Sequence, residues 1–265
     1  MRPLISIPGG DLRWRDPNKP ARLLPRRAAP AATLLLMGLS VVGCEGGDGG
    51  NKPSPEDWDG DGLTNEEEAY LGSNPEAADT DHDGYDDGLE VESNTDPLDG
   101  FDHPYAGGWP IADCRHDLEG TGTTPGQVAP QFSLMDQHGD GVRLHDFCDR
   151  VVVIASAAEW CQPCQVEATQ LKIWYDKHKD AGLMVITLLG EDINHQSPSL
   201  EDLQAWSAGF GATHPVLQDT SFSVTQTYVI DNTLPSTHII GRGGVVLEAG
   251  LMTITEDMVL DALAL

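Results

Sequence analysis

The stretch Glu159-Trp160-Cys161-Gln162-Pro163-Cys164 decides the fold of this chain, because two cysteines with two residues between them can form a disulfide only where the backbone bends tightly. The start of a helix supplies that bend. The apolar β-branched run at residues 151–154 predicts a buried strand, and residues 165–178 predict a helix. Cys161 would lie at the helix N-terminus, where free N–H groups and the positive end of the dipole favour a thiolate. We therefore predict Cys161 as the nucleophile and Cys164 as the less exposed, resolving thiol.

The same two cysteines could instead form half of a zinc site. Zinc would need two more ligands at a matching spacing, and the sequence has no second Cys-x-x-Cys and no His-x-x-x-His. Redox chemistry is therefore the favoured interpretation. The following histidines share no ligand spacing and are expected to be ordinary surface or core residues: His138, His145, His195, His214 and His238.

The motif Trp160-Cys161-Gln162-Pro163-Cys164, after a strand and before a helix, resembles a thioredoxin-fold active site. Residues 126–265 resemble the TlpA-like (redoxin) branch of thiol-disulfide oxidoreductases, and residues 128–134 and 142–147 are similar to the opening segment of that branch. The resemblance implies an α/β thioredoxin-like fold, in which a mixed central sheet has helices on both faces. It also implies protein thiols and disulfides as partners, an upstream electron donor, and no organic cofactor.

The expected elements of this domain alternate as the resemblance requires. Strands are predicted at residues 151–156, 183–189, 215–217, 236–240 and 245–248, with a hairpin turn around 241–244. Helices are predicted at residues 161–179, 199–210, 222–228 and 256–263.

The resemblance assigns roles to three further residues. Pro235 is expected to follow a cis peptide bond beside the disulfide, where the backbone of Leu234 would bind an extended partner peptide. Glu167 lies where TlpA-like proteins often hold a glutamate that assists proton transfer, although a solvated helix acid is an equal alternative. Trp160 is expected to pack against the sulfur rather than take part in chemistry. Ala155 stands where thioredoxin has a buried aspartate, which puts a thioredoxin-like proton path in doubt.

A thiol peroxidase is a less favoured alternative for this domain. Peroxiredoxins are similar in the opening segment, but they need Thr or Ser three residues before the attacking cysteine and Pro seven before it. This chain has Ala158 and Ile154 at those positions.

Acidic residues outnumber basic ones by 43 to 15, and the formal net charge is −28. Phosphate would repel such a chain, so nucleic acid is excluded as a partner.

Between residues 57 and 90 the acids are ordered in two loops with the oxygen-ligand spacing of an EF-hand. The candidate ligands of the first loop are Asp57, Asp59, Asp61, Leu63 (backbone carbonyl), Asn65 and Glu68. Those of the second loop are Asp79, Asp81, Asp83, Tyr85 (backbone carbonyl), Asp87 and Glu90.

Only short helices, at residues 66–71 and 87–92, fit beside these loops, since Ser-Asn-Pro and Asn-Thr-Asp-Pro follow them. Residues 56–102 therefore resemble thrombospondin type 3 calcium-binding repeats, with calcium in a structural role. A solvated acidic linker is the alternative. The loop signature in two copies disfavours it.

The sequence pattern at the N-terminus predicts that the protein is exported. Residues 1–43 have the charged-then-apolar pattern of a signal peptide and end in Val41-Val42-Gly43-Cys44, which resembles a bacterial lipoprotein box. Lipid on Cys44 would anchor the protein to a membrane of the bacterial cell envelope, facing the periplasm or the cell surface. The alternative is a signal peptide followed by an ordinary Cys44. Residues 44–55, rich in Gly, Asp and Pro, are expected to be a flexible spacer.

Residues 103–125 are predicted as a connector with limited structure. Cys114 in the connector and Cys148 could form a structural disulfide in an oxidising compartment, or remain two separate thiols.

Two functions follow from these features. The first is a cell-envelope thiol-disulfide oxidoreductase on a calcium-binding stalk. The second is a calcium-dependent surface or adhesion protein whose thioredoxin-like domain only presents a binding face.

Overall fold

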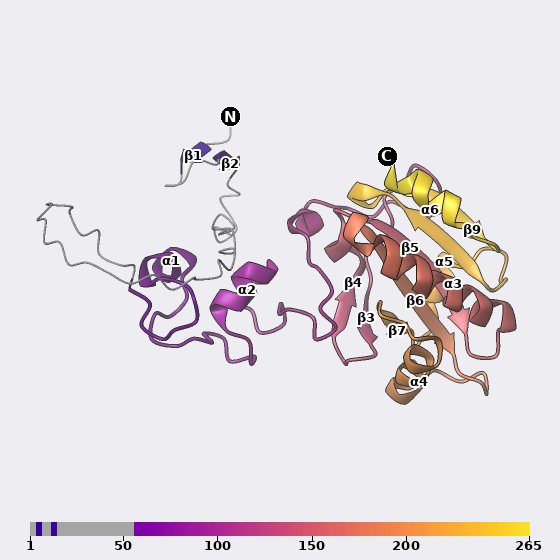
Figure 1. Cartoon of the computed structure of the whole chain (residues 1–265), viewed down its shortest axis with the longest axis horizontal. Coiled ribbons are helices and arrows are strands. Elements are labelled where there is room, and N and C mark those ends of the chain that lie inside the picture. Colours follow the sequence, from indigo (N-terminus) through magenta and orange to yellow (C-terminus); the bar gives the residue numbers. More distant parts are fainter. Residues whose placement is uncertain (1–3, 7–11, 15–55) are drawn as a thin grey trace, which may run out of the picture. The chain divides into compact units, whose positions relative to one another are not determined.

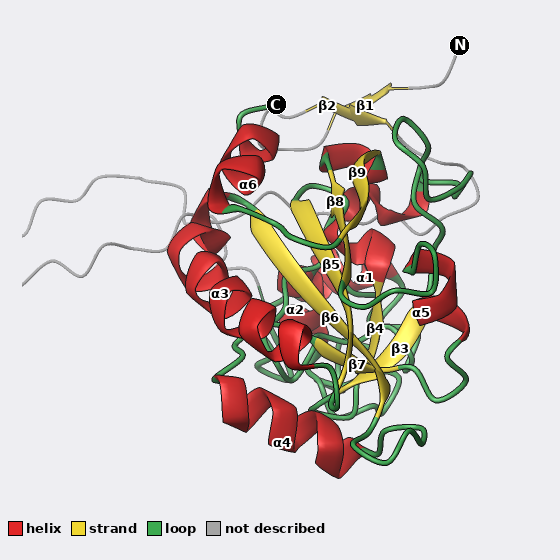
Figure 2. Cartoon of the chain, turned by 90° about the vertical axis from the view of Figure 1, so that its right-hand side faces the viewer, coloured by secondary structure: helices red, strands yellow, loops and turns green. Residues whose placement is uncertain are grey.

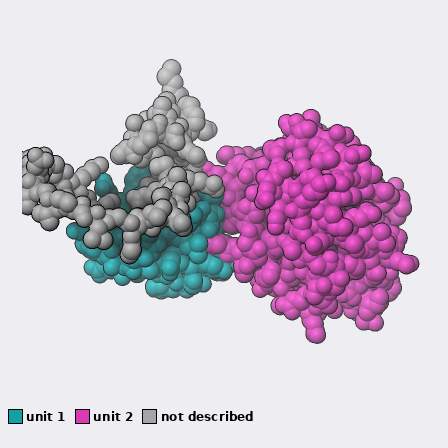
Figure 3. All heavy atoms as spheres, in the orientation of Figure 1, with its two compact units in different colours: residues 1–103 teal, residues 104–265 magenta. Residues whose placement is uncertain are grey.

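The computed structural model describes residues 4–6, 12–14 and 56–265, and the chain divides into two compact units, residues 1–103 and 104–265 (Figure 3). Strands β1 (Leu4–Ser6) and β2 (Leu12–Trp14) pair antiparallel within the predicted signal peptide. The rest of that segment, the predicted spacer at 44–55 and the predicted lipidation site Cys44 lie outside the described residues. Within the described part of the chain, no helix has both the length and the apolar character needed to span a membrane.

The second unit is built on a seven-stranded mixed sheet with the order β4-β3-β7-β6-β5-β8-β9 (Figure 1). Strands β5, β6 and β7 are parallel, whereas β3, β4, β8 and β9 join the sheet antiparallel. The strands are β3 (Ser133–Asp136), β4 (Gly141–Arg143), β5 (Val151–Ala158), β6 (Leu183–Glu191), β7 (Val216–Gln218), β8 (Ser236–Ile240) and β9 (Val246–Leu251). The helices are α3 (Gln162–His178), α4 (Leu200–Phe210), α5 (Ser223–Tyr228) and α6 (Glu256–Leu263), with 3₁₀ turns at Asp113–His116, Leu144–Phe147, Lys179–Ala181 and Arg242–Gly244.

Helices cover both faces of this sheet, with α3, α4 and α6 on one side and α5 on the other (Figure 2). Strand β5 is accordingly buried along its whole length, because neither face meets water. The β5–α3–β6 unit, followed by the β8–β9 hairpin and α6, is the core of a thioredoxin-like fold. The expected fold class is therefore confirmed, and the predicted helices and strands from residue 151 onward all form, with ends shifted by a few residues. Strands β3 and β4 were not predicted.

Residues 104–116 correct the expectation of a connector with limited structure. They lie within the second unit, and the side chains of Tyr105, Trp109 and Ile111 are part of its apolar core. Trp109 Nε1 donates a hydrogen bond to Asp136 Oδ2 at 2.8 Å. Turn-forming Gly and Pro residues made this stretch look open, but its spaced aromatic residues bury enough apolar surface to order it.

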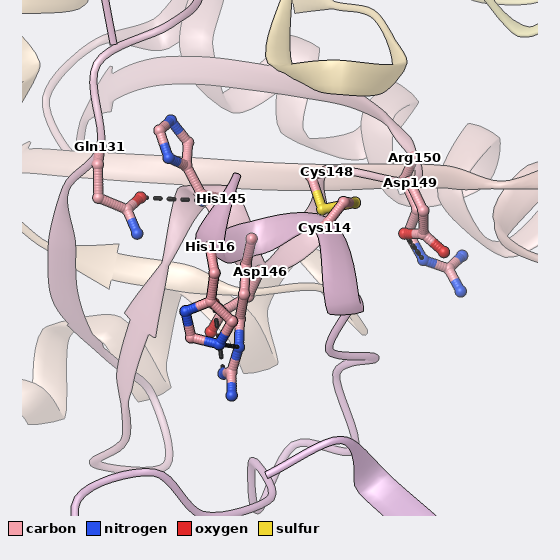
Figure 4. The surroundings of a disulfide bond; sticks show 9 residues. Cys114, His116, Gln131, His145, Asp146, Cys148, Asp149 and Arg150 are labelled. Carbon is pink, nitrogen blue, oxygen red and sulfur yellow. Dashed lines mark hydrogen bonds and ion pairs between the residues drawn. A yellow bond between two sulfur atoms is a disulfide. The ribbon is translucent and has the colours of Figure 1, made fainter. Parts of the chain in front are cut away.

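A disulfide joins Cys114 to Cys148, whose Cα atoms lie 6.0 Å apart, and Figure 4 shows Asp146 and the Asp149–Arg150 ion pair close to it. Asp146 is buried and binds several groups at once. It accepts hydrogen bonds from the Tyr105 hydroxyl group and, at 3.1 Å, from Arg143 Nε, and its other oxygen lies 3.6 Å from Arg115 Nη1. A covalent bond and a buried ion network thus both fasten residues 104–116 to the domain.

In the first unit, two short helices each follow an acidic loop. Helix α1 (Asn65–Leu71) starts with a capping box between Thr64 and Glu67, and helix α2 (Asp87–Ser93) follows the second loop. Both helices end on a residue with left-handed backbone, Gly72 and Asn94. Leu63 and Leu71 are buried here, so this unit has little apolar core of its own among the described residues.

Candidate active site

The active-site disulfide lies at the N-terminus of α3. Cys161 is the N-cap residue and forms a disulfide with Cys164, with their Cα atoms 5.3 Å apart. The backbone N–H of Cys164 points at Cys161 Sγ, at 3.3 Å. Pro163, in the first helical turn, suits this position because the N–H that it lacks would have no partner inside the helix. The N–H of Cys164 and the positive end of the helix dipole therefore act on the sulfur that is predicted to become a thiolate.

Both cysteines are buried in this oxidised state, with exposed fractions of 3% for Cys161 and 2% for Cys164. These fractions differ too little to distinguish the two thiols, so the lower exposure of Cys164 stays a prediction for the reduced state. Both sulfurs pack in a small apolar cluster with Ala158 and Leu203, and Leu234 lies against this cluster.

The peptide bond between Leu234 and Pro235 is cis, as the resemblance implied. It immediately precedes β8, which pairs with β5, the strand that leads to Cys161. Leu234 and the two cysteines meet in the same apolar cluster. The structure thus brings the predicted proline turn and the predicted nucleophile to one end of the sheet.

Glu167 lies on α3 one turn after Cys164 and is buried, with 7% of its surface exposed. Thr237 Oγ1 donates a hydrogen bond to Glu167 Oε1 at 3.0 Å. Burial raises the pKa of Glu167 to about 7, and the hydrogen bond from Thr237 opposes this rise. A buried carboxyl group that titrates near neutral pH can take up and return a proton, which a solvated helix acid would not do as readily.

Trp160 lies at the rim of the site and is 41% exposed. Its Nε1 donates a hydrogen bond to Glu191 Oε2 at 2.7 Å, and its ring lies 5.0 Å from that of His195. His195 Nδ1 is itself 3.1 Å from Glu191 Oε2. The indole is thus held by polar contacts at the end of β6 rather than by burial.

Thr237 and Glu191 had no part in the sequence interpretation. The pairing of β8 with β5 sets Thr237 opposite Ala155, and this register is known only from the structure. No local signal linked Glu191 to Trp160. His145, His214 and His238 are buried. Burial lowers the pKa of His214 and that of His238 to about 4, so these two are neutral core residues.

The two acidic loops of the first unit repeat the same internal contacts. Asp57 Oδ1 accepts the N–H of Gly60 and Asp79 Oδ1 accepts that of His82, both at 2.7 Å. The first three aspartates of each loop bring carboxylate oxygens within 4.8 Å of one another; the groups are Asp57, Asp59 and Asp61, and Asp79, Asp81 and Asp83. Gly62 and Gly84 both have a φ of 101°, which a side chain would strain.

Each loop ends in a buried carboxylate that accepts no hydrogen bond from the residues that the structure describes. Glu68 and Glu90 are fully buried, and neither oxygen of either side chain has a hydrogen-bond partner among residues 56–265. Burial, reinforced by neighbouring aspartates, raises the pKa of Glu68 to about 7 and that of Glu90 to about 8. An oxygen-only donor set closed by an unpaired glutamate fits a hard cation such as calcium.

The remaining predicted ligands have other contacts. Asn65 Oδ1 accepts the N–H of Trp58 at 3.2 Å, and Asp87 Oδ1 accepts the N–H of Thr80 at 2.8 Å. Each side chain therefore forms a hydrogen bond to the backbone of a residue seven positions earlier, which connects the two ends of its loop. The backbone N–H groups of Leu63 and Tyr85 donate hydrogen bonds to Asp61 and Asp83. The backbone carbonyl groups of Leu63 and Tyr85 are the atoms predicted to bind the cation.

Comparison with known proteins separates the same two regions. Residues 125–249 match the AhpC/TSA family, and residues 57–75 and 79–100 match the bacterial TSP3 repeat. The chain is 28% identical over 139 residues to the thiol-disulfide oxidoreductase ResA of Geobacillus kaustophilus, covering 52% of this chain and 76% of that protein. It is 26% identical over 134 residues to ResA of Halalkalibacterium halodurans, covering 51% and 72%.

Among solved structures, one similar chain is a putative thiol:disulfide interchange protein DsbE from Chlorobium tepidum. It is 25% identical with a TM-score of 0.46, covering 53% of this chain and 98% of that one.

Proposed function

We propose that this chain, a thiol-disulfide oxidoreductase whose thioredoxin-like domain matches the AhpC/TSA family over residues 125–249, exchanges disulfides with protein partners through Cys161 and Cys164. The observation that carries the proposal is the position of this disulfide, at the N-terminus of α3 and in one apolar cluster with Leu234 of the cis-proline turn. A helix N-terminus stabilises a thiolate. The neighbouring turn offers backbone groups to a partner peptide.

In the reductive direction, the Cys161 thiolate attacks one sulfur of a partner disulfide. A bond forms between Cys161 and that sulfur, and the partner's other sulfur leaves as a thiolate that takes up a proton. Cys164 then loses its proton and attacks Cys161 Sγ, which closes the Cys161–Cys164 disulfide and releases the partner's second thiol. The partner gains two electrons and the enzyme loses two. A dithiol electron donor returns the enzyme to its reduced state by the reverse exchange.

Glu167 is the group placed to move the proton in this sequence. It lies one helical turn from Cys164, is buried, and titrates near pH 7. It can accept the proton of the resolving thiol and return it in the next cycle. Peroxide reduction is disfavoured, because Ala158 offers no hydroxyl group to polarise a peroxide.

We propose further that the acidic segment is a calcium-bound spacer. Calcium would be held by the early aspartates of each loop together with Glu68 and Glu90, whose buried oxygens have no hydrogen-bond partner in the described part of the chain. The ion would supply the positive charge that orders these loops. With the lipoprotein-like Cys44, this arrangement would place the redox domain above a membrane of the cell envelope.

A trapping experiment tests the exchange reaction. A Cys164→Ser variant cannot resolve the mixed disulfide, so it should accumulate covalent adducts with partners at Cys161, visible on non-reducing gels and identifiable by mass spectrometry. Cys161→Ser should form none and should not reduce insulin. Adducts that form equally on both variants, or a reduced wild-type protein that reduces no disulfide, would remove the proposal. Partner binding that survives in Cys161→Ser would support the adhesion alternative.

A further inference from the structure

We propose that Thr237 is a positioning residue for the exchange reaction, whose hydroxyl group orients the Glu167 carboxyl group for proton transfer with the active-site thiols. The inference rests on the proposed function. The hydrogen bond from Thr237 Oγ1 to Glu167 Oε1 measures 3.0 Å and joins residues 70 positions apart in the chain. Thr237 is fully buried and Glu167 nearly so, which strengthens a hydrogen bond between them.

The neighbour of Thr237 on the adjacent strand offers no polar side-chain group to its hydroxyl group. Thr237 on β8 pairs with Ala155 on β5, so the two side chains lie on the same face and Ala155 presents only a methyl group. His238, the next residue on β8, points to the opposite face.

The carboxyl group has a free oxygen for the thiol proton. Oε1 is occupied by Thr237, whereas Oε2 of Glu167 makes no hydrogen bond to any described residue. The hydrogen bond therefore fixes which oxygen remains available. Glu167 shares α3 with Cys161 and Cys164, and the shift of its pKa arises only from burial and the Thr237 contact, with no charged neighbour contributing within the described part of the chain.

The direction of the effect follows from the donor. A hydroxyl group that donates to a carboxylate stabilises the charged form and lowers the pKa, against the effect of burial. Removing the hydroxyl group should raise the pKa of Glu167. The pH at which Glu167 can act as a base then rises with it.

The test is the pH profile of single-turnover reduction of a disulfide-bonded peptide by the full-length, prereduced protein. In Thr237→Val, the acidic limb of the profile should move to higher pH by about 0.5–1 unit. The rate at pH 7 should fall about two- to fivefold, as expected for a base with a pKa near 7. Thr237→Ser, which keeps the hydroxyl group, should restore the wild-type profile.

Three controls separate positioning from a loss of packing. Thr187→Val removes another buried hydroxyl group, 3.1 Å from His214 Nε2, and should leave the profile unchanged. In a Glu167→Gln background, Thr237→Val should cause no further loss. If Thr237→Val does not fold by circular dichroism, Thr237→Ala takes its place.

A Thr237→Val profile that coincides with that of the wild type would overturn the inference. So would a rate loss from Thr237→Val that is as large in the Glu167→Gln background as in the wild type, or a pH shift in Thr187→Val as large as that in Thr237→Val. Failure of the wild-type protein itself to reduce the peptide overturns the proposed function instead. The two failures are therefore distinguishable.

Discussion

At the scale of single residues, the burial of Glu167 carries a stability cost, and we propose that the same burial suits the residue to proton transfer. It is a buried carboxyl group next to the resolving cysteine, and its neighbour Thr237 offsets only part of the cost of burial. Groups with strongly shifted pKa values cluster at functional sites.

Replacing Glu167 should separate these two effects. Its folded pKa of about 7 lies above the ordinary 4.5, so its contribution to stability is lost as pH rises from about 4.5 through 7. Glu167→Gln removes this loss. As pH rises from 5 to 8, the unfolding free energy of the variant should therefore increase relative to that of wild type by on the order of 2–3 kcal/mol. Its exchange rate should fall, by about a hundredfold if proton transfer limits the rate.

Urea unfolding at both pH values and single-turnover kinetics measure the two effects. Glu248→Gln, at an exposed position, is the matched control and should change neither. An identical pH dependence of stability in Glu167→Gln and wild type would contradict the prediction.

At the scale of elements, residues 104–116 are fastened to the sheet by the Cys114–Cys148 disulfide and by the ion network around Asp146. The disulfide closes a loop with a sequence separation of 34 residues. Loops of this size restrict the unfolded chain considerably.

The double variant Cys114→Ser/Cys148→Ser should therefore lose about 2–4 kcal/mol of unfolding free energy. Its exchange activity at 25 °C should be kept, because the pair takes no part in the reaction. Denaturant unfolding and insulin reduction provide the two measurements. An unchanged unfolding midpoint would show that the bond does not constrain the unfolded chain, and a loss of exchange in the folded variant would show a redox role.

The two acidic loops differ from residues 104–116, because their buried and unpaired carboxylates oppose folding instead of stabilising it. The pKa values of Glu68 and Glu90, about 7 and about 8, lie above the ordinary 4.5. In calcium-free protein, the stability of this segment should therefore fall as pH rises from about 4.5 through 8.

Circular dichroism melts of chelator-treated protein at pH 5 and pH 8 measure this dependence. The melting transition of the segment should lie higher at pH 5. Saturating calcium should remove or reverse the difference, because the ion binds the charged carboxylates. A calcium-free transition that does not move with pH would contradict the prediction.

At the scale of the whole molecule, the two units are stabilised by different means. Residues 104–265 bury a large apolar core, whereas Leu63 and Leu71 are among the few buried apolar side chains described in the first unit. The first unit depends instead on polar contacts within its loops.

Calcium removal should therefore act on one unit only. In differential scanning calorimetry, chelator should lower or abolish the transition of the first unit and leave that of the redox domain in place. Glu68→Gln and Glu90→Gln should each weaken calcium binding, measured by titration calorimetry. The exposed Glu66→Gln should not. A calorimetric trace unaltered by chelator would leave the calcium assignment without support.

Much of this protein follows from patterns that act over a few residues. The Cys161–Cys164 spacing, the strand before it and the helix after it are local, and they were enough to predict the fold class and to single out the cysteine pair that forms a disulfide. The two loops are equally local, because a repeated aspartate spacing with Gly62 and Gly84 determines how each chain segment turns. The connector failed as a prediction because Tyr105 and Trp109 gain their burial from strands far along the chain.

The contacts that tune the site are decided only by tertiary structure. Glu167 meets Thr237 across 70 residues, and Trp160 meets Glu191 across 31. The pairing of Cys114 with Cys148 likewise depends on residues 104–116 packing against the sheet. Such pairs leave no periodic trace in the sequence, since each partner is chosen by strand order and helix packing rather than by its neighbours. The sequence by itself therefore determined the fold class and pointed to the cysteine pair that we propose reacts, and the tertiary structure decided which groups surround that pair.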